Sequence, residues 1–343
     1  MAKHARLRPS AAQGDLFVSN LEKSPSAELD APGPLDAAAN RRRFSSLGPE
    51  ETGSLTARSA TRASPRTARL PSQLDAPAAP FLKWAGGKSQ LLSQLSPLLP
   101  RGLSGRYHEP FVGGGAMFFA LSPRRAVLSD LNPDLVTCYQ VIRTQVEALI
   151  DALGEHVYEK DHYYAVRSQD AADLPPVARA ARFIFLNRTC FNGLHRVNRK
   201  GQFNVPFGRH TNPTICDATN LRRVSAALAH TEIHCRGFKQ VLDNAQAGDF
   251  VYFDPPYQPI SATSSFTAYT SSAFGPAQQA ELAEVFRALD ARGCKVMLSN
   301  SNAQFIRALY QDFDVREVLA TRAINRDASR RGPIAELVVR NYR

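Results

Sequence analysis

The chain has 343 residues, which suggests about two domains, and its 42 Lys and Arg against 31 Asp and Glu give a net charge of +11. Only +3 of this charge lies in residues 1–80, so the remaining residues hold +8 and favour a polyanionic partner. The sequence excludes a membrane-spanning chain, since it has no run of about 18 apolar residues, and its five cysteines form no CxxC pair typical of structural zinc.

Residues 1–78 are predicted to form a disordered tail. Phe17 and Phe44 are its only aromatic residues, and Ala, Ser, Pro and Arg dominate without apolar periodicity. Such a segment buries too little apolar surface to offset the entropy lost on ordering. Arg41-Arg42-Arg43 would suit a nucleic-acid arm, although a solvated tail is the simpler interpretation. The start of the chain lacks an apolar stretch, so we expect no signal peptide and a cytoplasmic location.

From Phe81 onward, short apolar segments alternate with helical patterns. The predicted strands are 106–112, 126–130, 231–235, 250–253 and 295–299. The predicted helices are 116–121, 135–150, 277–291 and 303–310. Segments 313–319 and 335–340 are expected to close the sheet as an antiparallel pair. This alternation predicts an α/β fold with a mainly parallel sheet.

Residues 151–228 interrupt this alternation. Helical stretches are followed by residues 187–212, which are rich in Asn, Gly, Arg and aromatic residues. Between Arg182 and Arg236 there are nine Lys or Arg and two Asp or Glu, a local net charge of +7. We therefore expect one α/β domain in two parts, 79–150 and 229–343, interrupted by a basic, mostly helical insert at 151–228.

A glycine-rich segment follows the first predicted strand, in the sequence EPFVGGGA at 109–116. Glycines there let the backbone approach a ligand and open a helix. Asp130 ends the next strand, where a carboxylate can accept hydrogen bonds from both ribose hydroxyls. Together they indicate a cofactor that contains a nucleoside, whereas the glycines alone would also suit a tight turn. The dinucleotide pattern GxGxxG is excluded, because Phe118 stands at its third glycine position.

The segment FLKWAGGKS at 81–89 ends like a phosphate-binding loop. We reject that interpretation, because Leu82 stands where GxxxxGK[ST] requires glycine and no apolar strand precedes it. Trp84, the only tryptophan, either packs in the core or covers a ligand. In the second case Lys88 would pair with a carboxylate.

The most specific motif is Asp254-Pro255-Pro256-Tyr257, directly after the strand predicted at 250–253. The prolines have no N–H and hold φ near −65°, which leaves the backbone carbonyls as rigid, free acceptors. The carboxylate of Asp254 and one carbonyl can hold an exocyclic amino group, and the ring of Tyr257 can stack on a base. The motif thus predicts an amino group held with its lone pair aimed at an electrophile.

These segments together resemble the Dam-type, or D12 class, DNA adenine-N6 methyltransferases. The likeness extends from Phe81 to the C-terminus. It also includes LSDLNPDL at 128–135 and FLNRTCFNGLHRVNRKGQFNVPFGRH at 185–210. The resemblance implies a Rossmann-like class I methyltransferase sheet, S-adenosyl-L-methionine as methyl donor, and N6 of a flipped adenine in double-stranded DNA as acceptor. It also implies a prokaryotic or phage protein that works at the nucleoid.

The resemblance implies a role for each matching residue. Asp254, Pro255, Pro256 and Tyr257 would be catalytic. The residues expected to bind the cofactor are Trp84, Lys88, Phe111, Gly113, Gly115, Asp130, Phe238 and Asp254. The loop at 261–269 would close over the flipped base. We expect neither a metal nor a membrane partner, and a monomer in solution.

The insert would be the target-recognition domain, with a β-hairpin whose tip, 199–202, enters the major groove. The residues expected to contact DNA are Asn192, Arg196, Asn198, Arg199, Lys200 and Arg209. The likeness departs from the family at two positions. Val197 stands where GATC-specific members carry an aromatic residue, and His195 where many relatives have tyrosine. The recognition sequence therefore stays open.

Two other functions remain as alternatives at this stage. One is a DNA-binding relative without catalysis, which would not need the glycine segment, Asp130 and Asp254 all intact. The other is a methyltransferase for RNA or protein amino groups, whose sites usually carry Asn-Pro-Pro-Tyr. Cytosine N4 also presents a similar amino group, although the order of the motifs favours adenine.

Overall fold

The structure, a computed structural model, describes residues 76–259, 274–321 and 333–343. The tail predicted at 1–78 lies outside the described residues except for its last three. The closing loop predicted at 261–269 lies outside them entirely, so both remain predictions.

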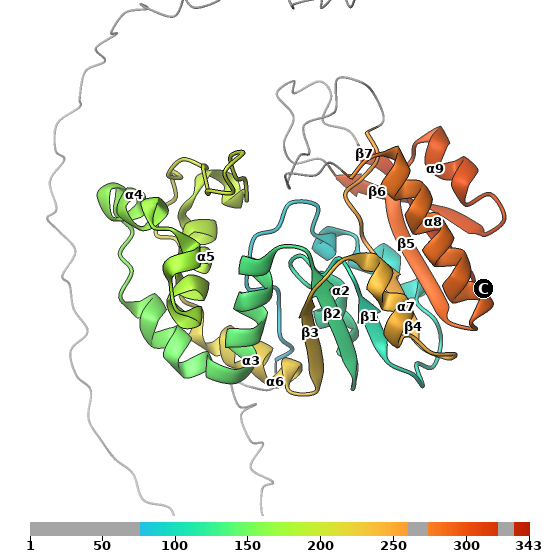
Figure 1. The fold of residues 1–343 in the computed structure, drawn as a ribbon, viewed down its shortest axis with the longest axis horizontal. Helices are drawn as coiled ribbons and strands as arrows, with labels where there is room; N and C mark the ends of the chain where they lie inside the picture. Colours follow the sequence, from blue (N-terminus) through green and yellow to red (C-terminus); the bar gives the residue numbers. More distant parts are fainter. Residues whose placement is uncertain (1–75, 260–273, 322–332) are drawn as a thin grey trace, which may run out of the picture. The chain divides into compact units, whose positions relative to one another are not determined.

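Strands and helices alternate through most of the described residues, as predicted (Figure 1). The strands are β1 (Tyr107–Glu109), β2 (Ala126–Asp130), β3 (Thr231–Cys235), β4 (Phe250–Phe253), β5 (Lys295–Ser301), β6 (Asp314–Thr321) and β7 (Pro333–Arg340). The helices are α1 (Leu92–Leu95), α2 (Ala116–Leu121), α3 (Pro133–Gly154), α4 (Lys160–Ser168), α5 (Pro176–Thr189), α6 (Ala218–Leu228), α7 (Val241–Asn244), α8 (Pro276–Ala291) and α9 (Gln304–Leu309).

The described strands form one sheet in the order β3-β2-β1-β4-β5-β7-β6. The first five strands in this order run parallel, and β7 pairs antiparallel with both β5 and β6. The predicted parallel sheet and its closing antiparallel pair are therefore confirmed. β1 stops at Glu109, shorter than the predicted 106–112, because Pro110 lacks an N–H and Gly113 turns the chain at φ +46°.

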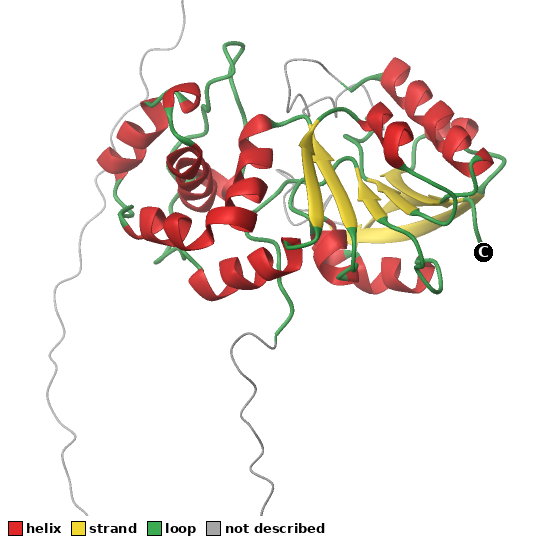
Figure 2. Cartoon of the chain, turned by 60° about the horizontal axis from the view of Figure 1, so that its bottom comes forward, coloured by secondary structure: helices red, strands yellow, loops and turns green. Residues whose placement is uncertain are grey.

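The sheet is covered on both faces, as Figure 2 shows with helices in red around yellow strands. Successive residues of β4 belong to different hydrophobic clusters. Phe250 and Tyr252 pack with the cluster that includes α3, whereas Val251 and Phe253 pack with the cluster under α8. Side chains of a strand alternate between its two faces, and both faces of β4 are buried. All four residues of the strand are therefore apolar, and the sequence shows a continuous apolar run.

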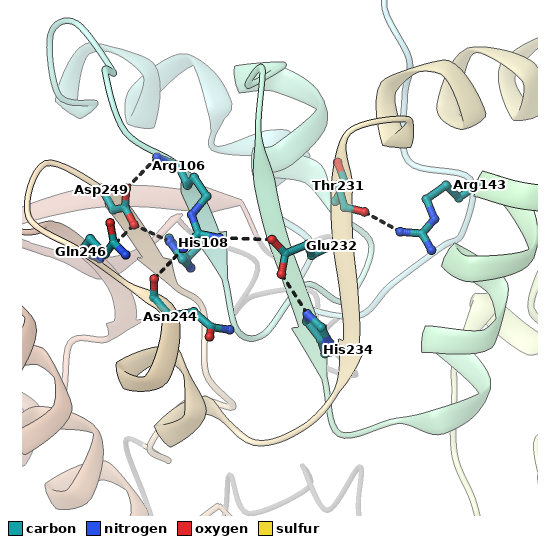
Figure 3. Close-up of polar contacts among 9 residues, drawn as sticks. All are labelled: Arg106, His108, Arg143, Thr231, Glu232, His234, Asn244, Gln246 and Asp249. Carbon is teal, nitrogen blue, oxygen red and sulfur yellow. Dashed lines mark hydrogen bonds and ion pairs between the residues drawn. The ribbon is translucent and has the colours of Figure 1, made fainter.

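Asp249 ties β1 to β4 at the edge where the parallel strands begin (Figure 3). Its carboxylate accepts hydrogen bonds from Arg106 N at 2.7 Å, Gln246 N at 3.0 Å and His108 Nε2 at 2.9 Å. Burial lowers the pKa of His108, which favours the neutral ring, and Nε2 faces the Asp249 carboxylate as the donor. This contact lies at the edge opposite the carboxyl ends of the strands and has a structural role.

The basic insert is built mainly from α4 and α5, with a small core of its own. Tyr163, Phe185 and Val205 are among the residues of this core. α3 kinks at Gln145 and continues to Gly154, across the boundary predicted after residue 150. The division into two parts and an insert stays a prediction.

No helix within the described residues is long and apolar enough to cross a membrane. The same residues contain no group of three or more His, Cys, Asp or Glu side chains placed to hold a metal ion.

Candidate active site

The glycine segment and the Asp-Pro-Pro-Tyr motif lie at the carboxyl ends of β1 and β4. The strand order reverses between these two neighbours, because β2 and β3 lie beyond β1, whereas β5 lies beyond β4. Ligands of open α/β sheets bind at such a reversal. β1 leads into the glycine segment after Glu109, and β4 leads into Asp254.

The glycine segment forms a close-packed floor under Trp84. Gly113 and Gly115 adopt φ of +46° and +69°, which a side chain would strain. A Cβ on Gly113 would stand 2.7 Å from Trp84 Cδ1 and Nε1, closer than packing allows. Trp84 and Gly113, both predicted to bind the cofactor, therefore pack directly against each other, and only glycine fits beneath the indole.

Asp130 lies at the end of β2, beside the glycine segment. Its Oδ2 accepts a hydrogen bond from Gly113 N at 3.2 Å, and its Oδ1 accepts one from Asn132 N at 2.9 Å. Burial raises the pKa of the Asp130 carboxyl, and these backbone N–H groups oppose that shift. The side chain is thus held in one orientation at the mouth of the glycine segment.

Aromatic rings gather next to the glycine segment. Phe111 stacks on Phe238, with ring centroids 5.6 Å apart and planes at 24°. Phe274 and Phe253 pack edge-on against Phe111 at 5.6 Å and 6.3 Å. The sequence predicted Phe111 and Phe238 as partners in one site, and the structure brings them together.

Lys88 forms a buried ion pair with Asp254. Its Nζ lies 2.7 Å from Asp254 Oδ1, with the Lys88 side chain 5% exposed and that of Asp254 18% exposed. The same Nζ donates to Gly86 O at 2.7 Å and lies 4.8 Å from the centroid of the Tyr257 ring. Burial raises the pKa of Asp254, whereas the Lys88 ammonium opposes that rise. The sequence predicted that Lys88 pairs with a carboxylate but did not identify it. In the structure that carboxylate belongs to Asp254.

The loop that follows β4 is held by side chains from two other elements. Gln279 of α8 is fully buried and donates from Nε2 to Pro256 O at 2.9 Å. Tyr257 donates from its hydroxyl to Glu336 Oε2 of β7 at 2.7 Å. The expectation that the carbonyls of this motif stay free is therefore wrong for Pro256, because α8 packs close enough to use it.

Sequence reasoning assigned no role to several polar residues that line or support this site. Glu109 is 3% exposed, accepts a hydrogen bond from the Tyr107 hydroxyl at 2.8 Å, and has its pKa raised by burial to about 8. Gln279 accepts a hydrogen bond from Asn300 Nδ2 at 2.9 Å. Only a weak signal in the sequence could have identified these residues. Each is a polar residue at a position of a strand or helix where the pattern predicts a buried apolar side chain.

The predicted hairpin is present in the insert. Asn198 N donates to Gln202 O at 2.9 Å, Asn204 N donates to Arg196 O at 3.0 Å, and Val197 pairs with Phe203 between them. The Asn198 side chain accepts hydrogen bonds from the backbone N–H of two turn residues, so it shapes the tip.

The six residues predicted to contact DNA are all exposed. Two of them have partners inside the hairpin, because Asn198 closes the turn and Arg196 donates from Nε to Asn204 Oδ1 at 2.7 Å. Asn192 adopts a left-handed φ of +56°. Arg199 and Lys200 project at the tip.

The parallel sheet with an inserted antiparallel β7, the glycine segment and the Asp-Pro-Pro-Tyr loop define a Rossmann-like methyltransferase. The sequence profile of the D12 class N6 adenine-specific DNA methyltransferases matches residues 84–324. The chain belongs to this family, and it is by family an adenine-specific DNA methyltransferase.

Three relatives named as methyltransferases or methylases match most of the chain. A Type II methyltransferase of Methanocaldococcus jannaschii is 46% identical over 77% of this chain and 99% of its own length. A Type II methyltransferase of Lactococcus lactis subsp. cremoris is 44% identical over 77% of this chain and 95% of its own. The DNA adenine methylase of Escherichia coli K12 is 35% identical over 75% of this chain and 93% of its own.

Proposed function

We propose that the chain transfers a methyl group from S-adenosyl-L-methionine to N6 of an adenine flipped out of double-stranded DNA. The observation that carries this proposal is the position of Asp254, at the carboxyl end of β4 and in a buried ion pair with Lys88. A carboxylate at that strand end faces the place where open α/β sheets hold their ligands.

The residues around the glycine segment fit this cofactor. Gly113 and Gly115 allow the positive-φ turn after β1, and Asp130 beside it offers a fixed carboxylate for two ribose hydroxyls. Phe111 and Phe238 offer apolar rings for its adenine. Trp84 covers the glycine floor on the side assigned to the methionine part. When bound, the cofactor supplies an electrophilic methyl group on a positively charged sulfur.

The amino group of the target adenine would be held by two acceptors. Gln279 occupies Pro256 O, so the carbonyl of Pro255 is the proline acceptor proposed here, together with the Asp254 carboxylate. Two acceptors on the N–H₂ group fix the lone pair toward the methyl group. The neutral amine is too weak an acid to lose a proton beforehand. As N6 bonds to the methyl group and the sulfur–methyl bond breaks, the nitrogen becomes acidic and its proton would pass to the Asp254 carboxylate that accepts it.

Stacking on Tyr257 would help to hold the extrahelical base. Flipping costs a few kcal/mol, and stacking on an aromatic side chain returns about 1–3 kcal/mol per base. The bond from the Tyr257 hydroxyl to Glu336 fixes the ring plane before the base arrives. Lys88 Nζ lies over the same ring, which helps to position it.

Residues 151–228 are proposed to recognise the target. The net charge of +7 between Arg182 and Arg236 suits phosphates. The exposed Arg199, Lys200 and Arg209 suit contacts to phosphates or guanine edges. We further propose that the protein acts as a monomer in the cytoplasm, at the nucleoid of a prokaryote or phage host.

The test is methyl transfer to DNA by the full chain. Purified protein is incubated with labelled S-adenosylmethionine and unmethylated bacterial genomic DNA, and modified bases are mapped by single-molecule sequencing. N6-methyladenine at one short motif is the expected result. Asp254→Ala should lower transfer at least about 100-fold while DNA binding persists.

Asp312→Ala is the matched control, because Asp312 is an exposed carboxylate outside the site. It should transfer methyl groups at the native rate. Absence of incorporation by the native chain would refute the proposed function. Near-native transfer by Asp254→Ala would refute the role of the carboxylate.

A further inference from the structure

Lys83, the residue before Trp84, is joined by a buried side-chain amide to the base of the recognition hairpin. We call this set of hydrogen bonds the clamp. Asn187 of α5 is 2% exposed and bonds both backbone groups of Lys83: its Oδ1 accepts from Lys83 N at 2.9 Å, and its Nδ2 donates to Lys83 O at 2.8 Å. Its Nδ2 also donates to Gly193 O at 3.1 Å. One buried amide therefore joins the residue before Trp84 to the residue two positions before His195.

Close packing reinforces this clamp. A Cβ on Gly193 would stand 2.5 Å from Lys83 Cδ and 2.6 Å from Lys83 Cβ. The backbone of Gly193, at φ +63°, thus lies directly against the Lys83 side chain. The two segments cannot separate without breaking the hydrogen bonds of a buried amide, which costs about 1–3 kcal/mol for each unsatisfied group.

His195 extends the clamp to Trp84. The two rings stack with centroids 5.6 Å apart and planes at 25°. His195 also lies 5.2 Å from the Phe183 ring of α5 and 5.8 Å from the Phe203 ring on the opposite hairpin strand. The indole thus has the glycine segment on one side and a ring of the hairpin base on another.

A cavity of about 510 Å³ lies between the hairpin and the helices α4 and α5, lined in part by Arg167, Arg182, Val197 and Gln202. A hollow of this size leaves room for the hairpin to shift. Movement of the hairpin would therefore reach Trp84 through His195.

We propose that His195 and Asn187 are positioning residues that couple DNA binding to cofactor binding. This inference rests on the proposed function, since it takes the glycine floor as the S-adenosylmethionine site. DNA seated on the hairpin fixes His195, His195 holds Trp84 on the glycine floor, and the cofactor meets a preformed pocket. The coupling is reciprocal, so bound cofactor strengthens DNA binding by the same factor.

Trp84 is the only tryptophan in the chain, so tryptophan fluorescence reports on the surroundings of this one indole. The experiment titrates S-adenosylhomocysteine, which transfers no methyl group, into the full chain with and without a duplex that carries the motif mapped by sequencing. The ratio of the two dissociation constants is the coupling factor. We expect the duplex to tighten binding about 5- to 150-fold in the native chain.

His195→Ala should bring this ratio close to one, whereas His195→Tyr, which keeps a ring against Trp84, should retain it. In steady-state kinetics, His195→Ala should raise KM for S-adenosylmethionine more than it lowers kcat. Asp312→Ala is the matched control, because Asp312 is exposed and lies outside the clamp, the hairpin and the site. It should leave both dissociation constants and their ratio unchanged.

Asn187→Asp provides a second variant if His195→Ala fails to fold. It keeps the acceptor for Lys83 N and removes the donor to Lys83 O and Gly193 O. It too should lower the ratio. A native ratio of one, or an unchanged ratio in both variants, overturns the coupling while methyl transfer stands. Failure of the native chain to bind S-adenosylhomocysteine at all would instead overturn the proposed cofactor.

Discussion

Replacing Lys88 with Met tests the electrostatics of the site most directly. The side chains are similar in length, so the change removes the ammonium and leaves the packing nearly intact. Lys88 Nζ lies 2.7 Å from Asp254 Oδ1, and both side chains are largely withdrawn from water. Solvent therefore screens this ion pair little. Loss of the ammonium should act strongly on the protonation of the Asp254 carboxylate.

The direction of the effect follows from the opposing causes at Asp254. Burial raises the pKa of this carboxyl, and Lys88 lowers it. A neighbouring cation lowers the pKa of an aspartate, so Lys88→Met should raise the pKa of Asp254 further above its usual range. The ionised carboxylate is the proposed acceptor. Activity is therefore lost as pH falls through this pKa, and the loss begins at a higher pH in the variant than in the native chain.

The assay is kcat for methyl transfer against pH, at saturating S-adenosylmethionine so that weaker cofactor binding does not enter. Arg222→Met is the matched control, because Arg222 forms an exposed ion pair with Glu147 on the surface. Its acid limb should coincide with that of the native chain. An acid limb of Lys88→Met that stays within about half a pH unit of native would refute the assignment of Asp254 as the titrating acceptor.

Three further predictions concern stability, stacking and charge. Asp249→Ala leaves the N–H groups of Arg106 and Gln246 and the His108 ring without their buried acceptor. It should cost about 3–5 kcal/mol in urea unfolding, and a loss under about 1 kcal/mol would contradict that account. Tyr257→Ala should lower kcat/KM about 5- to 100-fold and Tyr257→Phe far less; equal losses would argue against stacking. Raising salt from about 50 to about 200 mM should weaken binding to duplex DNA about 10³-fold or more if six or more phosphates are neutralised. The affinity is measured by filter binding, and an affinity that does not change with salt would contradict this prediction.

Most of the fold could be predicted from local patterns in the sequence. The strand at 250–253 and the helix after it were placed correctly, because a doubly buried strand is apolar throughout and a helix repeats its apolar positions. β1 was predicted too long, since the apolar residues after Pro110 continue the pattern although the chain has already turned. The rule that parallel strands end at one edge also brought the glycines and Asp254 into one site, whereas Trp84 joined them through the resemblance to the family.

The partners of these residues could not be predicted in the same way. Gln279 follows Pro256 by more than 20 positions, and their hydrogen bond depends on how closely α8 packs against the loop. The same holds for Glu336, which reaches Tyr257 from β7 only because that strand is inserted antiparallel beside β5. Neither pairing leaves a periodic or compositional trace.

The sequence by itself determined the class of chemistry, because that depends on residue types with local constraints: glycines where φ is positive, prolines without N–H groups, and an acid at a strand end. The tertiary structure decided which of these groups are already engaged. In it the ammonium of Lys88 pairs with Asp254, the Pro256 carbonyl accepts a hydrogen bond from Gln279, and the indole of Trp84 stacks on His195. These choices arise from the packing of elements distant in the chain, where differences of about an ångström separate a bond from none.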